Sequence, residues 1–97
     1  MPYFCYILEC ADGSFYTGMT TDPARRERQH NAGRGATYTR LHRPVHLVYI
    51  EEQPDRSSAL HRESAIKKLT HAKKKLLTQG EMTVSYTHLT LPTIYSV

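Results

Sequence analysis

Apolar and aromatic residues are concentrated in three short runs of the chain, which predict three β-strands. The runs cover residues 3–10, 14–20 and 45–52 and are rich in the aromatic and branched side chains that suit a pleated surface. Gly13 lies between the first two runs and can adopt the left-handed conformation of a tight turn. We therefore expect the first two runs to form a β-hairpin.

The length of the hairpin loop decides whether Tyr6 and Tyr16 share a face of the sheet. A two-residue turn at Asp12 and Gly13 places the two tyrosines on opposite faces. A three-residue loop closed by Gly13 as a bulge instead places Tyr6 opposite Gly18 and both tyrosines on one face. We favour the three-residue loop because Gly18 leaves space for the Tyr6 ring, and we expect the other face to carry Cys5, Ile7, Phe15 and Met19.

Helix start and stop signals divide the rest of the chain. Asp22 before Pro23 starts a helix that ends at Gly33, and Pro54 and Asp55 precede a second helix over 56–69. A short third helix is expected between Thr70 and Gly80, and residues 33–44 are expected to form a basic loop. The order of elements predicts an α+β fold, a three-stranded, mainly antiparallel sheet flanked by helices, over residues 1–80.

The last stretch, residues 81–97, departs from this pattern. It has no charged residue after Glu81, many threonines and no helical apolar period. It resembles translated adaptor or frame-shifted sequence, although an ordinary β-prone tail is the alternative. We therefore expect residues 81–97 to lie outside the fold.

Composition narrows the functional class. The 97 residues contain 13 Lys and Arg against 9 Asp and Glu, a net charge of +4 that weakly favours an anionic partner such as nucleic acid. No apolar run is long enough to span a bilayer, and the N-terminus lacks the pattern of a signal peptide. Cys5 and Cys10 point to opposite faces of one strand and lack zinc-ligand spacing, which indicates reduced thiols in a cytoplasmic protein.

Candidate catalytic residues lie on the first two predicted helices. Arg26 and His30 share one helix face, which is either a solvated basic face or, because the helix follows the second strand closely, part of a site near Tyr16. In the second helix Glu63 falls near the centre of the apolar arc formed by Ala59, Leu60, Ile66 and Leu69. A carboxylate there needs a partner, either an arginine or a metal ion. Phenols, a guanidinium, an imidazole and a metal-binding carboxylate together suit phosphodiester hydrolysis.

These residues resemble the motifs of the GIY-YIG nuclease family, and specifically its small stand-alone bacterial members. Phe4-Cys5-Tyr6 stands at the first motif and Tyr16-Thr17-Gly18 at the second, with the usual gap between the tyrosines. The resemblance covers residues 3–78 and implies catalytic roles for Tyr6, Tyr16, Arg26, His30 and Glu63. It implies that Glu63 holds Mg²⁺ or Mn²⁺ and that DNA is the substrate, with RNA left open. Phe4 replaces the motif glycine and Met19 stands where many members have lysine, and no late supporting asparagine is found.

Three functions follow from these patterns. The first is a metal-dependent endonuclease acting on DNA, in repair or recombination. The second is a nucleic-acid-binding domain with little activity, and the third is a protein-interaction domain. Binding of DNA in either of the first two readings would use a basic set with one tyrosine, namely Arg25, Arg28, Arg34, Tyr38, Arg40 and Arg43.

Overall fold

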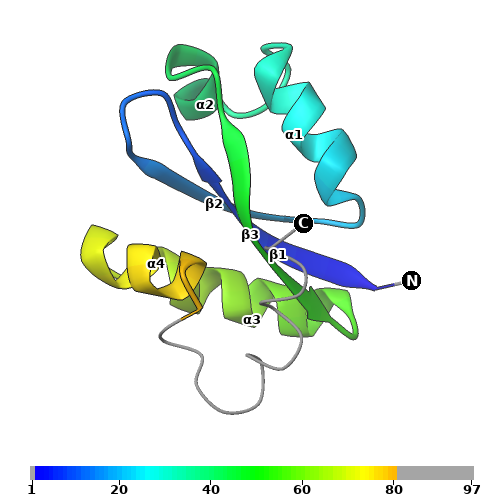
Figure 1. Ribbon diagram of the computed structural model, residues 1–97. Coiled ribbons are helices and arrows are strands. Elements are labelled where there is room, and N and C mark those ends of the chain that lie inside the picture. The colour runs from blue at the N-terminus through cyan, green and yellow to red at the C-terminus, as the bar shows by residue number, and fades with distance from the viewer. Residues whose placement is uncertain (1, 81–97) are drawn as a thin grey trace.

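The computed structural model describes residues 2–80, which form a three-stranded antiparallel sheet between two layers of helices (Figure 1). The sheet has the order β2-β1-β3. The elements are β1 Tyr3–Glu9, β2 Phe15–Thr20, α1 Pro23–Asn31, α2 Thr37–Leu41, β3 His46–Gln53, α3 Arg56–Lys67 and α4 His71–Thr78. The expected α+β class is confirmed. The prediction about residues 81–97 falls outside the described part of the chain.

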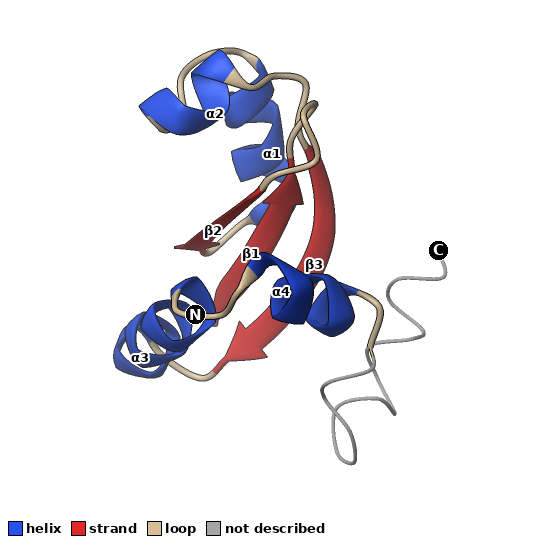
Figure 2. Cartoon of the chain, turned by 90° about the vertical axis from the view of Figure 1, so that its left-hand side faces the viewer, coloured by secondary structure: helices blue, strands red, loops and turns tan. Residues whose placement is uncertain are grey.

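Both faces of the central strand β1 are covered. Its residues Cys5–Leu8 are all buried, although their side chains alternate between the two faces. Helices α1 and α2 lie over the face of Tyr6 and Leu8, whereas α3 and α4 lie over the face of Cys5 and Ile7 (Figures 1 and 2). None of the helices within residues 2–80 is long and apolar enough to cross a membrane.

The hairpin adopts the three-residue loop. Cys10 N–H donates to the Ser14 carbonyl at 2.8 Å, and Gly13 has the positive φ of 86° that the bulge requires. Tyr6 therefore pairs with Gly18, and Leu8 pairs with Tyr16. Both tyrosines lie on the face covered by α1, and the predicted register is confirmed.

Helix α1 is fixed to the sheet through its own polar side chains. Asp22 caps its start by accepting from Arg25 N–H at 3.1 Å, and Pro23 occupies the first turn. The Asn31 side chain makes two hydrogen bonds with the Val45 backbone, at 2.9 and 2.8 Å. The Glu27 carboxylate accepts from Leu47 N–H at 2.7 Å. Glu27 and Asn31 thus hold one side of α1 against β3, which leaves the neighbouring positions Arg26 and His30 to face the tyrosines.

The predicted basic loop over 33–44 is not entirely loop. Residues Thr37–Leu41 form the short helix α2, and its Thr39 is fully buried. The segment carried no apolar period, because the residue that α2 buries is polar and its partner is His30. The sequence pattern could not reveal a helix stabilised through one buried hydroxyl.

Helix α3 begins as predicted but ends two residues earlier, at Lys67, and one member of its apolar arc is wrong. Asp55 caps the helix by accepting from Ser58 N–H at 2.8 Å. Ala59 and Ile66 are fully buried, but Leu60 is 40% exposed. Arg62 on the same helix instead turns toward β3, where its Nε donates to the Glu51 carboxylate at 2.7 Å. That carboxylate also accepts from the Tyr49 hydroxyl and the Gln53 amide, so a partly buried polar network joins α3 to β3.

Candidate functional site

The centre of the predicted site is a buried pair of side chains, Tyr6 from β1 and His30 from α1. The Tyr6 hydroxyl lies 3.0 Å from His30 Nε2, and both residues are almost entirely buried. The Tyr6 ring reaches this position by crossing Gly18 of β2, where an added Cβ would lie 2.5 Å from the Tyr6 hydroxyl. Gly18 is therefore needed because no side chain can share the space of the Tyr6 ring.

Tyr16 lies beside this pair and leads outward to the surface. Its ring centroid is 5.2 Å from that of His30, with the planes tilted by 60°. Tyr16 also lies nearly parallel to Tyr38 at 6.4 Å, and Tyr38 stacks on His42 at 4.2 Å. Because Tyr38 is 40% exposed, these rings connect the buried histidine with the molecular surface.

Arg26 supplies the positive charge next to the pair. Burial raises the pKa of the Tyr6 phenol to about 12, and the neighbouring Arg26 guanidinium opposes part of that rise. Burial also lowers the pKa of His30 to about 4, and the charge of Arg26 lowers it further. The guanidinium is oriented by Gln29, whose Oε1 accepts from Arg26 Nη1 at 2.9 Å. At neutral pH the structure thus combines a neutral phenol and a neutral imidazole with one fixed cation.

Glu63 lies on α3, on the other side of the sheet from α1. Its side chain is 18% exposed and lies 3.7 Å from Lys67 Nζ. The carboxylate charge contributes, after burial, to the raised pKa values of both Tyr6 and Cys5. Glu63 is therefore close enough for its charge to act on Tyr6. The two residues nevertheless belong to opposite sides of the sheet, because Tyr6 faces α1 whereas Glu63 lies on α3.

The donor set around Glu63 limits what kind of cation the site could hold. Within residues 2–80 no group of three or more His, Cys, Asp or Glu side chains is arranged to bind a metal ion. A zinc site of the usual kind needs more protein ligands than this. Mg²⁺ or Mn²⁺ can be held by one carboxylate when water and a substrate phosphate supply the other ligands. Glu63 fits that arrangement.

The residues predicted to contact nucleic acid are all at the surface. Arg25 and Arg28 are exposed on α1, and the others lie in and around α2, namely Arg34, Tyr38, Arg40 and Arg43. Arg43 also has a local structural role, because it donates to the backbone carbonyls of Arg40 at 3.1 Å and Asn31 at 3.3 Å. The Tyr38 hydroxyl donates to Ser14 Oγ at 2.6 Å, which holds α2 against the hairpin loop.

Two residues near His30 were not anticipated from the sequence, Thr39 and Gly35. Thr39 Oγ1 lies 2.6 Å from His30 Nδ1. A Cβ on Gly35 would overlap the His30 ring, so glycine is required there for space. Their only signal was the unusual glycine and threonine content of residues 33–39, which shows nothing of their contact with a histidine on another helix.

The comparison with protein families agrees with this arrangement. The model of the GIY-YIG catalytic domain matches residues 2–76, a span that includes Tyr6, Tyr16, Arg26, His30 and Glu63. The chain belongs to the GIY-YIG family. The resemblance noted from the motifs is therefore confirmed. Met19, which departs from the family pattern, packs against the apolar core that contains Cys5 and Ile7 and not toward Tyr6.

Relatives of this chain are small and close to it in length. A UPF0213 protein of Haloquadratum walsbyi is 53% identical over 77 residues, covering 79% of this chain and 86% of the relative. A UPF0213 protein of Staphylococcus aureus is 51% identical over 72 residues, covering 74% and 88%. Neither name describes an activity, so these relatives support membership of the family and leave the reaction to be tested.

Two solution NMR structures share the fold. The UPF0213 protein of Bacillus halodurans is 41% identical, with a TM-score of 0.54 over 93% of this chain and 95% of its own. A protein of E. faecalis is also 41% identical, with a TM-score of 0.59 over 89% and 92%. The architecture described above is thus found in solved relatives of the same size.

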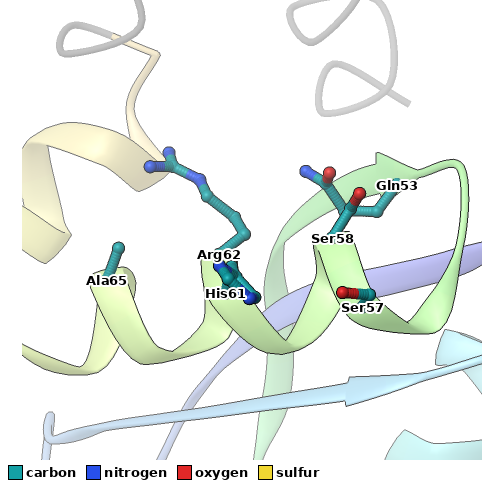
Figure 3. A pocket seen from close by; sticks show the side chains of 6 residues that line it. All are labelled: Gln53, Ser57, Ser58, His61, Arg62 and Ala65. Atoms are coloured by element: carbon teal, nitrogen blue, oxygen red, sulfur yellow. The ribbon is translucent and has the colours of Figure 1, made fainter.

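A cavity elsewhere on the molecule does not belong to this cluster of residues. It has a volume of about 510 Å³ and lies between α3 and the end of β3 (Figure 3). Its lining consists of Gln53, Ser57, Ser58, His61, Arg62 and Ala65. Arg62 in this lining is already paired with Glu51.

Proposed function

We propose that this GIY-YIG protein is an endonuclease that hydrolyses phosphodiester bonds in DNA with the help of one Mg²⁺ or Mn²⁺ ion. The observation that carries the proposal is the contact between the Tyr6 hydroxyl and His30 Nε2, with Arg26 and Tyr16 beside it. Buried phenol–imidazole pairs next to a cation are costly to build and suit proton movement near a phosphate. The two buried, unbridged cysteines fit a cytoplasmic protein.

Each residue has a proposed task. Arg26 holds the scissile phosphate and stabilises the charge that develops on it. A phenol of the Tyr6 and Tyr16 pair accepts a proton from the attacking water, with His30 as the next acceptor. Glu63 would hold the cation, which when bound supplies polarisation of a phosphate oxygen and stabilisation of the leaving group. The exposed arginines of α1 and of residues 34–43 would bind the DNA backbone.

The test compares two glutamine variants on a panel of labelled DNA structures. The panel contains duplex, branched, flapped and single-stranded DNA with an RNA control, in Mg²⁺, in Mn²⁺ and in EDTA. We expect the wild type and Glu52→Gln, a control at an exposed carboxylate, to cleave only with metal. Glu63→Gln should bind DNA but cleave at background level, because the charge that attracts the cation is gone.

Stability separates this role of Glu63 from a structural one. Its ion pair with Lys67 is long, and the Lys67 side chain is 54% exposed, so the pair is worth less than about 1 kcal/mol. Glu63→Gln should therefore melt close to the wild type. A folded Glu63→Gln protein that cuts at the wild-type rate would remove Glu63 from the mechanism. DNA binding without cleavage by the wild type would favour the alternative function, a nucleic-acid-binding domain.

A further inference from the structure

The contacts of Thr39 show which way the protons point around His30. Thr39 Oγ1 donates to the Ala36 carbonyl at 2.9 Å, and a carbonyl can only accept. With its single proton on that carbonyl, the hydroxyl is the acceptor at its second contact, with His30 Nδ1 at 2.6 Å. Nδ1 is therefore the ring nitrogen of His30 that carries a proton.

The role of the second ring nitrogen, Nε2, follows from that of Nδ1. His30 is fully buried and its pKa is lowered to about 4, so the imidazole is neutral and has one proton only. With that proton on Nδ1, Nε2 is an acceptor. The Tyr6 hydroxyl, 3.0 Å away, then donates to it. A chain of hydrogen bonds thus runs from Tyr6 through His30 and Thr39 to the Ala36 carbonyl. In each of them the proton points away from Tyr6.

We propose that Thr39 is a positioning residue that fixes His30 in the tautomer protonated on Nδ1, so that Nε2 is available to take the proton of Tyr6. The consequence for catalysis rests on the proposed nuclease function. Because the Tyr6 proton is directed to His30, the lone pairs of the phenol oxygen remain for a donor on the Arg26 side. When an attacking water gives its proton to the Tyr6 oxygen, the Tyr6 proton passes to Nε2. As the water oxygen bonds to phosphorus, the bond from phosphorus to the leaving oxygen breaks. The products are a phosphate carrying the new hydroxyl, an alkoxide leaving group that takes a proton from solvent, a neutral Tyr6 and a positively charged His30 that later returns its proton to solvent.

The surroundings of the ring leave Thr39 as the group that decides the tautomer. Within residues 2–80, the charged and titratable neighbours of His30 are Tyr6 on β1, Tyr16 on β2 and Arg26 on its own helix. Tyr16 presents its ring to the imidazole, and Arg26 acts on both nitrogens through its charge. Gly35 packs against the Nδ1 side, where an added Cβ would overlap Nδ1.

The experiment records the ring nitrogens of His30 by two-bond ¹H–¹⁵N correlation NMR near pH 7, without DNA, with His30→Gln used to assign the signals. Three proteins are compared: the wild type, Thr39→Val, which keeps the shape but loses the hydroxyl, and Thr39→Ser, which keeps the hydroxyl. We expect the wild type and Thr39→Ser to show a protonated Nδ1 and an unprotonated Nε2. In Thr39→Val the buried Nδ1 proton has no acceptor, so the pattern should change toward protonation at Nε2.

Cleavage is measured on the same three proteins. We expect Thr39→Val to lose about 100-fold in turnover at saturating DNA, the scale of a lost proton acceptor, and Thr39→Ser to restore it. A wild-type spectrum with the proton on Nε2, or an unchanged spectrum in Thr39→Val, overturns the proposal. If Thr39→Val does not fold, the wild-type and Thr39→Ser spectra still decide it. Absence of cleavage by all proteins would reject the nuclease function while leaving the tautomer assignment to the NMR result.

Discussion

The two faces of the sheet are built from different chemistry, although the same strand β1 supplies both. On the α3 and α4 face the buried residues are chiefly apolar, from Cys5 and Ile7 to Ala59, Ile66 and Leu77. On the α1 and α2 face the buried centre contains Tyr6, His30 and Thr39, which satisfy one another through hydrogen bonds. A buried polar cluster costs free energy that an apolar core would not, so its presence indicates a task other than stability.

The comparison also explains the use of glycine. Gly18 and Gly35 both lie where the polar cluster needs room, beside Tyr6 and beside His30. The apolar face needs no glycine to make room for a polar ring, because methyl and thiol groups fill its space. The difference predicts that substitutions on the α1 face mainly lower catalysis, whereas substitutions on the α3 face mainly lower stability.

The largest effect on the polar face is expected from Arg26→Ala. Removing the guanidinium beside Tyr6 should lower turnover at saturating DNA by roughly 3–4 kcal/mol of transition-state stabilisation, or about 10²- to 10³-fold. Arg34→Ala, an exposed arginine outside the cluster, is the matched control and should weaken DNA binding with little change in turnover. Equal loss of turnover in both variants would contradict the assignment of Arg26.

On the apolar face, Ile66→Ala should lower the free energy of unfolding by about 3 kcal/mol, because it leaves a cavity in the core. Leu60→Ala on the same helix is the control. Leu60 is 40% exposed, so its loss should be below about 1 kcal/mol. Urea denaturation measures both, and turnover per folded molecule should be unchanged. A large loss of turnover in folded Ile66→Ala would show that the two faces are coupled.

As the pH falls, the free energy of unfolding should decrease through His30 on the polar face before the carboxylates are protonated. The pKa of His30 is about 4 in the folded protein against 6.5 for the free side chain, so the unfolded state binds a proton that the native state excludes. The stabilisation is complete above pH 6.5 and decreases as the pH falls toward 4. Between pH 8 and 5 we expect a loss of about 2 kcal/mol in the free energy of unfolding.

The measurement is urea denaturation as a function of pH. His30→Gln should flatten this limb of the profile, and His61→Gln, at an exposed histidine of α3, should leave it in place. The same slope in wild type and His30→Gln would show that His30 is not the group that titrates.

The smallest expected effect comes from the same substitution, threonine to valine, made once on each face of the sheet. Thr17 faces α3, and its buried hydroxyl has no hydrogen-bond partner within residues 2–80. Thr17→Val should therefore stabilise the protein by about 1 kcal/mol, since an unsatisfied polar group is removed. Thr39→Val should instead destabilise it, because the Thr39 hydroxyl has two partners. Thermal melting distinguishes the two, and the same sign for both would contradict the comparison.

The sequence by itself determined the parts of the molecule that depend on neighbours along the chain. The loop before Ser14, with Gly13 at positive φ, set the register that brings Tyr6 and Tyr16 to one face. Asp22 and Asp55 marked the starts of α1 and α3, and the spacing of Arg26 and His30 put them on one helix side. These are local effects of turn geometry, capping and helical period, which a sequence shows directly.

Only the tertiary structure decided the parts that join distant segments. Helix α2 exists because a polar residue, Thr39, is buried against His30, and no apolar period announces such a contact. Leu60 is exposed, whereas Arg62 on the same helix pairs with Glu51 of β3, a partner that the helix pattern cannot reveal. The tautomer of His30 depends on a hydroxyl nine residues away and on the Ala36 carbonyl behind it. Hydrogen bonds between buried polar groups are specific to position in space, so their pairing appears only when the chain has folded.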